Sequence, residues 1–202
     1  LSQTPFLRLH LPLSGSPGGS LVFNTLEKIM FEMFGFSDYA LRFFPYLFSC
    51  LSLIVFYMCL RRFTSQKACL IGTTLFSCST NLVFYAADLR PYSLDVFITT
   101  VIIMTYFWYR DQKHLDTWNI LLLIVGGGVC LVSSFITPFL LFSLGTVLLW
   151  SAFLRRRWKH CQSLMFIGLC WGLIFLGYYW VSLQHWRGHS DGMRYYILAF
   201  QY

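Results

Sequence analysis

Long runs of sequence without a charged side chain constrain this chain more than any other feature. Residues 43–60, 68–87, 117–154 and 161–184 contain no Asp, Glu, Lys or Arg. A membrane-spanning helix needs about 20 mostly apolar residues, whereas the alternating ten-residue pattern of a membrane β-barrel is absent. Charged residues form only 11% of the chain, against about 25% in soluble proteins. The runs therefore predict an all-α, polytopic membrane bundle.

We expect about six spans, and the Pro, Ser and Gly content between apolar runs sets their limits. The uncharged run 117–154 is too long for one helix, and we expect Thr137 to be an N-cap with Pro138 in the following first turn. The predicted spans cover roughly 43–60, 68–87, 91–109, 117–134, 137–154 and 161–184. Residues 1–42 and 185–202 would then form the segments outside the bundle.

Basic residues mark three of the connections between these spans. They are Arg61, Arg62 and Lys67; Arg110 and Lys113; and Arg155, Arg156, Arg157 and Lys159. Since cytoplasmic loops carry an excess of Lys and Arg, we expect these loops in the cytoplasm and both chain ends, with the 88–90 and 133–137 connections, on the outer face. The net charge of +7 is thus mostly a topology signal. Because the basic residues form no single groove, we expect no nucleic-acid partner.

The connection between the second and third predicted spans carries the candidate site. Residues 85–95 read YAADLRPYSLD, which places acids, an arginine and tyrosines between two apolar runs. Ionisable residues near a bilayer are costly and are functional candidates by default; the alternative is a short loop with solvated charges. Pro91 suits the first turn of a helix that descends from the outer face, so that the helix N-terminus and Arg90 could receive a phosphate.

The start of this helix decides which side chains lie together. Asp88, Tyr92 and Asp95 share one face if the helix extends back to residue 88, but only Tyr92 and Asp95 do so if it begins at the proline. Asp95 would lie a turn below the surface and need a partner, or it could serve a structural hydrogen bond. Its candidate partners are Arg90, Arg42, Arg194 or a metal.

An amphipathic segment precedes the first predicted span. In residues 21–35 an apolar stripe of Leu26, Ile29, Met30 and Met33 is interspersed with charges, which is typical of a helix lying at the outer membrane interface. Gly35 suits its C-cap. The preceding Gly- and Ser-rich residues 13–20 favour a linker over a phosphate-binding loop.

Cysteine and histidine patterns favour no metal centre. The seven cysteines lie in or at the ends of apolar runs and form no CxxC pair, so we expect small packing residues without disulfides. His10, His185 and His189 lie in the predicted outer segments and lack a metalloenzyme spacing such as HExxH. We expect Trp186, Tyr195 and Tyr196 to be interfacial aromatic residues.

Three motifs in a fixed order resemble a known enzyme family. They are FxxLEK over residues 23–28, FGxSxYALRxxP over 34–45, and YAADLRPYSLD over 85–95, with an apolar span that ends in LRR at 60–62 between the last two. Over roughly residues 12–150 the chain resembles bacterial GT-C glycosyltransferases of the family-39 type, which are related to protein O-mannosyltransferases and aminoarabinose transferases.

The resemblance implies an integral membrane enzyme, placed in a bacterial inner membrane with its site facing the periplasm. Such enzymes take a sugar from a polyprenyl-phosphate donor and transfer it, by an inverting displacement, to a lipid, glycan or protein acceptor. The chemistry needs a carboxylate base and cations for the leaving phosphate. The resemblance implies that Arg90 binds the lipid phosphate and that Asp88 supports it or binds a metal or sugar, with Tyr92, Asp95 and Arg42 at the substrate. The resemblance implies no particular cofactor, and a divalent metal is kept as an alternative.

Two departures from the family pattern matter. Gly19 and Ser20 replace a usual proline pair, and Asp88 stands where Glu is commoner. The family's main acidic residue lies in an earlier outer loop, so we expect the chain to be a fragment that lacks the main base and is inactive alone. The alternatives are a transporter or flippase for lipid-linked substrates, which calls for charges at the membrane midplane and for inverted repeats, and a non-catalytic assembly subunit.

Overall fold

The computed structural model describes residues 20–35, 37–112 and 116–180, and all regular elements in these ranges are helices. In chain order they are α1 (Leu21–Phe34), α2 (Asp38–Leu60), α3 (Gln66–Ser77), α4 (Thr80–Ala87), α5 (Tyr92–Asp111), α6 (Thr117–Ser133), α7 (Thr137–Leu154) and α8 (Trp158–Tyr178). The expected all-α membrane bundle is confirmed. The predictions for residues 1–19 and 185–202, and for the histidines and aromatic residues there, lie outside the described residues.

The described helices differ in their capacity to cross a membrane. Four are long and apolar enough: Tyr39–Leu60, Tyr92–Asp111, Thr137–Leu154 and Trp158–Tyr178. α3 and α4 reach that length only together and are bent by 56° at a short break, whereas α6 is a shorter apolar helix. The described part therefore gives four spans, or five with the bent pair counted as one, where the sequence predicted about six.

The bend between α3 and α4 follows from side-chain hydroxyls that bond to their own helix. Thr73 and Thr74 donate to carbonyls one turn earlier at 2.9 Å, and Ser77 Oγ donates to the Thr74 carbonyl at 2.8 Å. Such bonds compete with the backbone ladder and often bend a helix. α3 ends at Ser77, and α4 begins anew after its N-cap Ser79.

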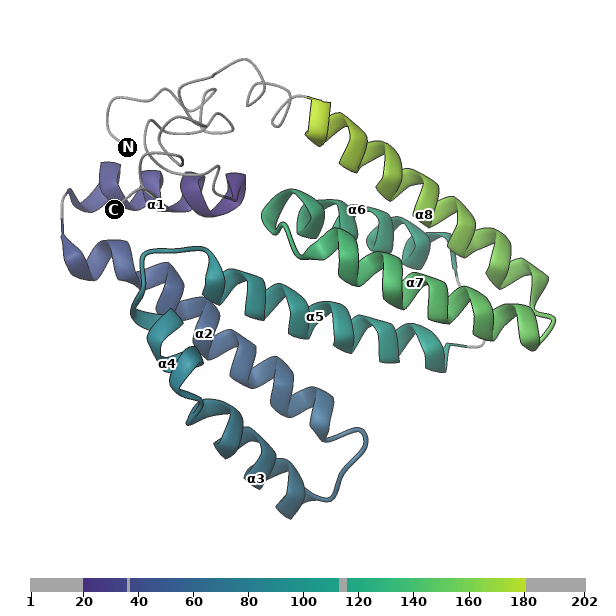
Figure 1. Cartoon of the computed structure of the whole chain (residues 1–202), viewed down its shortest axis with the longest axis horizontal. Helices are drawn as coiled ribbons and strands as arrows, with labels where there is room; N and C mark the ends of the chain where they lie inside the picture. Colours follow the sequence, from purple (N-terminus) through teal and green to yellow (C-terminus); the bar gives the residue numbers. More distant parts are fainter. Residues whose placement is uncertain (1–19, 36, 113–115, 181–202) are drawn as a thin grey trace, which may run out of the picture.

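Figure 1 shows how these helices pack. α2 lies along α5 and also contacts α3 and α4, while α8 packs against both α6 and α7. α1 lies across one end of the bundle, where it contacts α2 and α6. Phe23 of α1 joins Leu94, Ile98 and Ile102 of α5 in a buried apolar cluster. The burial of Phe23 therefore attaches α1 to the end of the bundle at which α5 begins.

The connections between the helices divide between two ends of the bundle. Arg110 at the end of α5 lies over the Phe63 ring that follows α2, with 5.9 Å from guanidinium carbon to ring centroid. Near that end of α5, Tyr109 contacts His160 at the start of α8, with 6.4 Å between ring centroids. The three basic connections therefore lie at one end, and the 88–91 and 134–136 connections lie at the other with α1 (Figure 1).

The predicted N-cap of α7 was wrong. Thr137 is the first residue of α7 and not its N-cap, which is Ile136. Thr137 is fully buried, and its hydroxyl has no hydrogen-bond partner among the described residues. Ser134 caps the turn instead, because its hydroxyl accepts the Ile136 N–H at 3.3 Å. Pro138 occupies the first turn as predicted.

A tryptophan interlocks α6 and α8. The Trp171 indole lies directly against Gly127, and its Nε1–H donates to the Leu123 and Ile124 carbonyls at 3.2 and 3.3 Å. A Cβ at Gly127 would overlap the indole, whereas a Cβ at Gly126 would meet nothing within 4 Å. The glycine run thus permits close helix packing, as is common in membranes.

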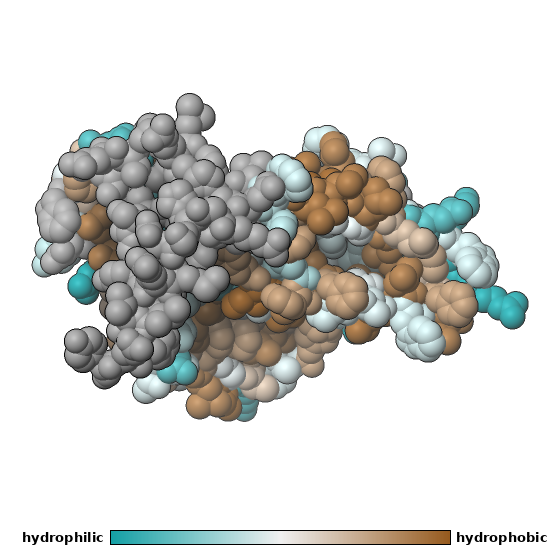
Figure 2. All heavy atoms as spheres, turned by 45° about the horizontal axis from the view of Figure 1, so that its top comes forward, coloured by the Kyte–Doolittle hydropathy of each residue, from teal (hydrophilic) through white to brown (hydrophobic). Residues whose placement is uncertain are grey.

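Apolar side chains cover much of the described surface. On α8, Phe166, Leu169, Leu173 and Leu176 form an outward row at helical spacing, each more than half exposed. Figure 2 shows brown, hydrophobic atoms along the bundle and teal, hydrophilic atoms at the right-hand end, where α7 and α8 join in Figure 1. Such a surface would be unstable in water, and it matches the hydrocarbon of a bilayer.

Gly127→Ala tests the interlock of α6 and α8. We expect it to lower the free energy of unfolding by about 1–3 kcal/mol, because the new methyl group must displace the indole. Gly126→Ala is the matched control and should not destabilise the protein, since the added methyl group meets open space. Thermal unfolding in detergent, followed by tryptophan fluorescence, measures both variants. Equal unfolding temperatures for the two variants would contradict this packing.

Candidate functional site

Asp88, Arg90 and Tyr92 form a polar cluster in the connection between α4 and α5. Arg90 Nε lies 3.7 Å from Asp88 Oδ2, and Arg90 Nη1 donates to the Tyr92 hydroxyl at 3.5 Å. The Tyr92 ring packs against Tyr85 of α4, with 4.8 Å between centroids. The structure therefore brings together three of the residues that the sequence selected.

Local backbone geometry sets this cluster. Asp88 ends α4 as its C-cap, and its N–H donates to the Phe84 carbonyl at 3.1 Å. Pro91 is the N-cap of α5, and its carbonyl accepts the Asp95 N–H at 3.0 Å. The helix therefore does not extend back to residue 88. Of the two sequence-based alternatives, the structure has the one in which only Tyr92 and Asp95 lie one turn apart.

Arg90 is the cation of this cluster, and its side chain is 64% exposed. The hydrogen bond to the Tyr92 hydroxyl and the charge of Asp88 raise the pKa of Arg90 above its usual range, so that it stays protonated. It immediately precedes the N-terminus of α5, where unpaired N–H groups and the helix dipole favour an anion. The arrangement can bind a phosphate group that approaches from outside the bundle.

Asp95 has a different partner from those that the sequence suggested. Its carboxyl lies near the Ser134 side chain, whose hydroxyl accepts the Ile136 N–H. No ion pair joins Asp95 to Arg90 or Arg42 among the described residues. The Asp95 carboxyl therefore lies where α5 meets the α6–α7 turn.

Below the cluster lies a cavity that we call the lateral slot. Its volume is about 520 Å³, and six of its lining residues define it: Phe56, Phe76, Tyr85, Tyr92, Asp95 and Ile103. These residues come from α2, α3, α4 and α5. Tyr92 belongs to both the cluster and the slot, so the Arg90 guanidinium lies one hydrogen bond from the slot wall. Sequence patterns could not predict this cavity, because its walls come from four different helices.

Arg42 and a metal site are not supported as parts of this cluster. Arg42 is exposed on α2, and within the described ranges no hydrogen bond or ion pair joins it to the cluster residues. The described part also contains no group of three or more His, Cys, Asp or Glu side chains that could hold a metal ion. The substrate role of Arg42 stays a prediction.

A buried carboxyl on α1 was missed by sequence reasoning. Glu27 is 8% exposed, and its Oε1 has no hydrogen-bond partner in the described part of the chain. Burial raises the pKa of Glu27 from its ordinary 4.5 to about 7. Its neighbour Lys28 is also buried and forms an ion pair with Glu32, with 3.8 Å between Nζ and Oε1.

The buried face of α1 differs from the predicted apolar stripe. Phe23 and Glu27, one turn apart, lie inside, whereas Met33 is 68% exposed and Ile29 is 37% exposed. The helix itself and the Gly35 C-cap are as predicted; Gly35 has φ +70°, and its N–H donates to the Phe31 carbonyl. The outward apolar residues agree with a helix that lies on a membrane surface.

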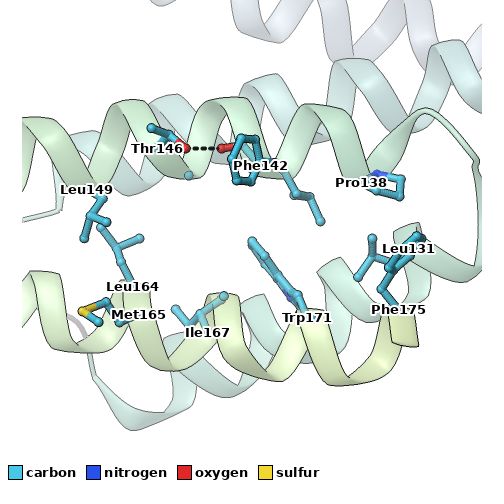
Figure 3. A pocket seen from close by; sticks show the side chains of 14 residues that line it. Leu131, Pro138, Phe142, Thr146, Leu149, Leu164, Met165, Ile167, Trp171 and Phe175 are labelled. Carbon is cyan, nitrogen blue, oxygen red and sulfur yellow. Dashed lines mark hydrogen bonds between the residues drawn. The ribbon is translucent and has the colours of Figure 1, made fainter. Parts of the chain in front are cut away.

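A second cavity between α7 and α8 offers no comparable chemistry. It measures about 380 Å³ and is lined mostly by apolar side chains. In Figure 3 Trp171 rises from α8 into the space below α7, and the Thr146 hydroxyl donates to the Phe142 carbonyl of its own helix at 2.7 Å. No charged side chain lines this cavity. The Asp88–Arg90–Tyr92 cluster therefore remains the better candidate site.

Comparison with known proteins agrees with the motifs. The family model described as dolichyl-phosphate-mannose-protein mannosyltransferase matches residues 18–181. The match runs from the start of α1 to the end of α8 and includes the cluster and the lateral slot. No curated protein and no solved structure matches the chain.

Glu27→Gln tests the burial of the α1 carboxyl through the pH dependence of stability. With a folded pKa of about 7 and an ordinary value of 4.5, the folded state keeps a proton that the unfolded state releases between these two values. The stability of the wild type relative to the variant should be greatest below pH 4.5. It should fall as the pH rises through 7, by at most about 3 kcal/mol.

Thermal unfolding at a series of pH values from about 4 to about 8 measures the difference in stability between the wild type and the variant. Asp116→Asn is the control, because Asp116 is exposed and forms no ion pair among the described residues. Its profile should parallel that of the wild type. Parallel profiles for Glu27→Gln and wild type would contradict a buried carboxyl.

Proposed function

Since the chain belongs to the dolichyl-phosphate-mannose-protein mannosyltransferase family of GT-C membrane glycosyltransferases, we propose that it uses a polyprenyl-phosphate sugar as donor. The acceptor is a lipid, glycan or protein at the membrane surface. The observation that carries this proposal is the exposed Arg90 at the N-terminus of α5, held between Asp88 and Tyr92.

Arg90 acts on the leaving group. Transfer of the sugar breaks the bond between its anomeric carbon and a phosphate oxygen, so that negative charge grows on the lipid phosphate. A guanidinium can meet phosphate oxygens with two parallel N–H bonds, and a fixed cation at developing charge stabilises the transition state. The N–H groups that begin α5 add positive potential at the same place.

Asp88 and Tyr92 position this cation. Asp88 is already engaged by Arg90 and its side chain is only 25% exposed, which favours an orienting role over that of the main base. Tyr92 holds the guanidinium from the other side through its hydroxyl. We keep Asp95, one turn deeper on α5, and Arg42 on α2 as proposed substrate-binding residues.

The site faces the periplasm or lumen in this proposal. The basic connections gather at the end of the bundle away from Arg90 (Figure 1). The positive-inside rule assigns that basic end to the cytoplasm. A bacterial inner membrane with the cluster on the periplasmic side fits this charge distribution.

Arg90→Ala tests the assignment of the lipid phosphate. In membranes that contain the complete product of the gene, we expect sugar transfer from a labelled polyprenyl-phosphate donor to fall by about 100-fold or more in kcat/KM, the usual effect of removing one transition-state donor. Arg90→Lys should retain part of the activity, because it keeps the charge but loses the bidentate geometry.

Arg61→Ala is the matched control, because Arg61 is also an exposed arginine but lies at the basic end of the bundle. It should transfer sugar at the wild-type rate. Wild-type transfer by Arg90→Ala, at equal protein abundance in the membrane, would show that the phosphate binds elsewhere.

A further inference from the structure

A group of basic side chains lies where α7 connects to α8, and we call it the basic turn. Its four members are exposed: Arg155, Arg156, Arg157 and Lys159. None of them forms an ion pair with an acid among the described residues. Arg157 is the N-cap of α8 and forms no capping hydrogen bond through its side chain. The first N–H groups of α8, beside several guanidinium groups, can therefore bind a phosphate.

Aromatic side chains flank the basic turn. Phe153 at the end of α7 lies near both Trp150 and Trp158, with ring centroids 6.4 and 5.9 Å away. The two tryptophans are 64% and 62% exposed. Because tryptophan is enriched at the depth of lipid headgroups, a phosphate on the basic turn would lie at that depth. This placement favours the phosphate of a membrane lipid over a free anion.

A buried hydroxyl without a partner lies beside the start of α8. Tyr109 is 5% exposed, and its Oη has no hydrogen-bond partner in the described part of the chain. Its ring contacts the ring of His160 in the first turn of α8. The buried Nε2 of His160 likewise has no described partner. Since nearly all buried polar groups in proteins are hydrogen-bonded, these two atoms indicate a polar ligand at this place.

Tyr109 also lines a cavity of about 170 Å³, which we call the inner cavity. It lies between α5, α6, α7 and α8, and most of its lining is apolar. The Thr105 hydroxyl in the lining donates to the Val101 carbonyl of its own helix at 2.8 Å, so it offers no donor to a ligand. An apolar cavity of about 150 Å³ holds a six-carbon ring. The inner cavity can therefore hold a segment of an acyl chain with a similar number of carbons.

The inner cavity adjoins the α7–α8 cavity that Figure 3 shows. Both linings include Gly145, Leu164 and Trp171. The lining of the α7–α8 cavity also includes Phe142 and Met165, which are more than half exposed, so this cavity faces the surrounding lipid. A Cβ at Gly145 would meet nothing within 4 Å. The open space there gives an acyl chain a passage from the bilayer into the inner cavity.

We propose that an anionic glycerophospholipid binds here, with its phosphate on the basic turn and one acyl chain in the inner cavity. The Tyr109 hydroxyl donates to an ester carbonyl just below the phosphate. Charge complementarity selects an anionic lipid, as in other basic pockets between membrane helices. The site lies at the end of the bundle opposite Arg90, so the inference goes beyond the proposed function and does not depend on it.

Photo-crosslinking of the complete gene product in phosphatidylcholine vesicles tests this inference. The probe is phosphatidylglycerol with a diazirine in one acyl chain, and the label is measured on the α6 and α7 peptides that line the inner cavity. We expect labelling that saturates as the probe is increased and that unlabelled phosphatidylglycerol displaces. Labelling that rises without saturation would identify bulk lipid and overturn the inference. Displacement by inorganic phosphate would identify a free anion as the ligand and also overturn it.

The double variant Arg156→Gln with Arg157→Gln tests the phosphate end. We expect the apparent affinity for the probe to fall by about tenfold or more, since each basic residue near an anionic lipid contributes about fivefold. Arg61→Gln with Arg62→Gln is the matched control, because it removes the same charge from exposed residues at the same end of the bundle. It should lower the affinity by less than about threefold. Equal losses in the two double variants would show a general surface attraction and no site.

Tyr109→Phe tests the hydrogen bond to the lipid. We expect the apparent affinity to fall by about fivefold, the usual effect of losing one hydrogen bond. If no ligand met this hydroxyl, the variant would remove only an unpaired polar group, and unchanged labelling would contradict the proposed contact.

Gly145→Leu tests the passage of the acyl chain. The new side chain fills the space between the two cavities, so labelling of the inner cavity should be largely lost. Gly177→Leu is the matched control, because a Cβ at Gly177 also meets nothing within 4 Å and Gly177 lines neither cavity. Equal labelling of these two variants would place the acyl chain outside the inner cavity.

Discussion

A bilayer gives a peptide group nothing to hydrogen-bond with, and this constraint underlies the whole structure. Each helix satisfies its own backbone, so that charged side chains lie towards the ends of the bundle. The break between α3 and α4 is an exception among the described connections, since it lies within one candidate span. Even the hydroxyls within the spans follow the rule, as Thr99, Thr105 and Thr146 all donate to carbonyls of their own helix. Charged side chains in this chain therefore lie at the two ends of the bundle. One end carries the basic connections, and the other carries the Asp88–Arg90–Tyr92 cluster.

The basic end and the cluster end have different physical roles. Arg61, Arg110 and the arginines of the α7–α8 connection lie at one end, where Arg110 packs over aromatic rings. At the other end Arg90 is held by Asp88 and Tyr92 beside the start of a long helix, and an apolar cavity opens below it. A cation fixed above an apolar slot suits a lipid with an anionic head, which is the donor that we propose for this family member.

The features that could be predicted from the sequence are those that depend on residues close together along the chain. Charge-free runs revealed the helices, the proline at 138 located the turn before α7, and the Asp88–Arg90–Tyr92 cluster was predictable because its members lie within five positions of each other. Tertiary contacts decided the rest. The sequence could not place Ser134 beside Asp95, since they belong to different hairpins of the chain, and it could not show that Glu27 faces inward while Met33 faces outward. The bend after Ser77 could not be predicted either, because no proline or glycine lies at the break.

The proposed site requires the Arg90 cluster to face the side of the membrane opposite the basic connections. Single cysteines introduced at Leu89 and at Arg156, each exposed at its own end of the bundle, test it directly with a membrane-impermeant maleimide on intact cells. The unsubstituted protein is the control for maleimide labelling of the seven native cysteines, which lie in or at the ends of helices. We expect labelling of Leu89→Cys in intact cells and of Arg156→Cys only after permeabilisation. Labelling of Arg156→Cys from outside, with Leu89→Cys protected, would contradict it.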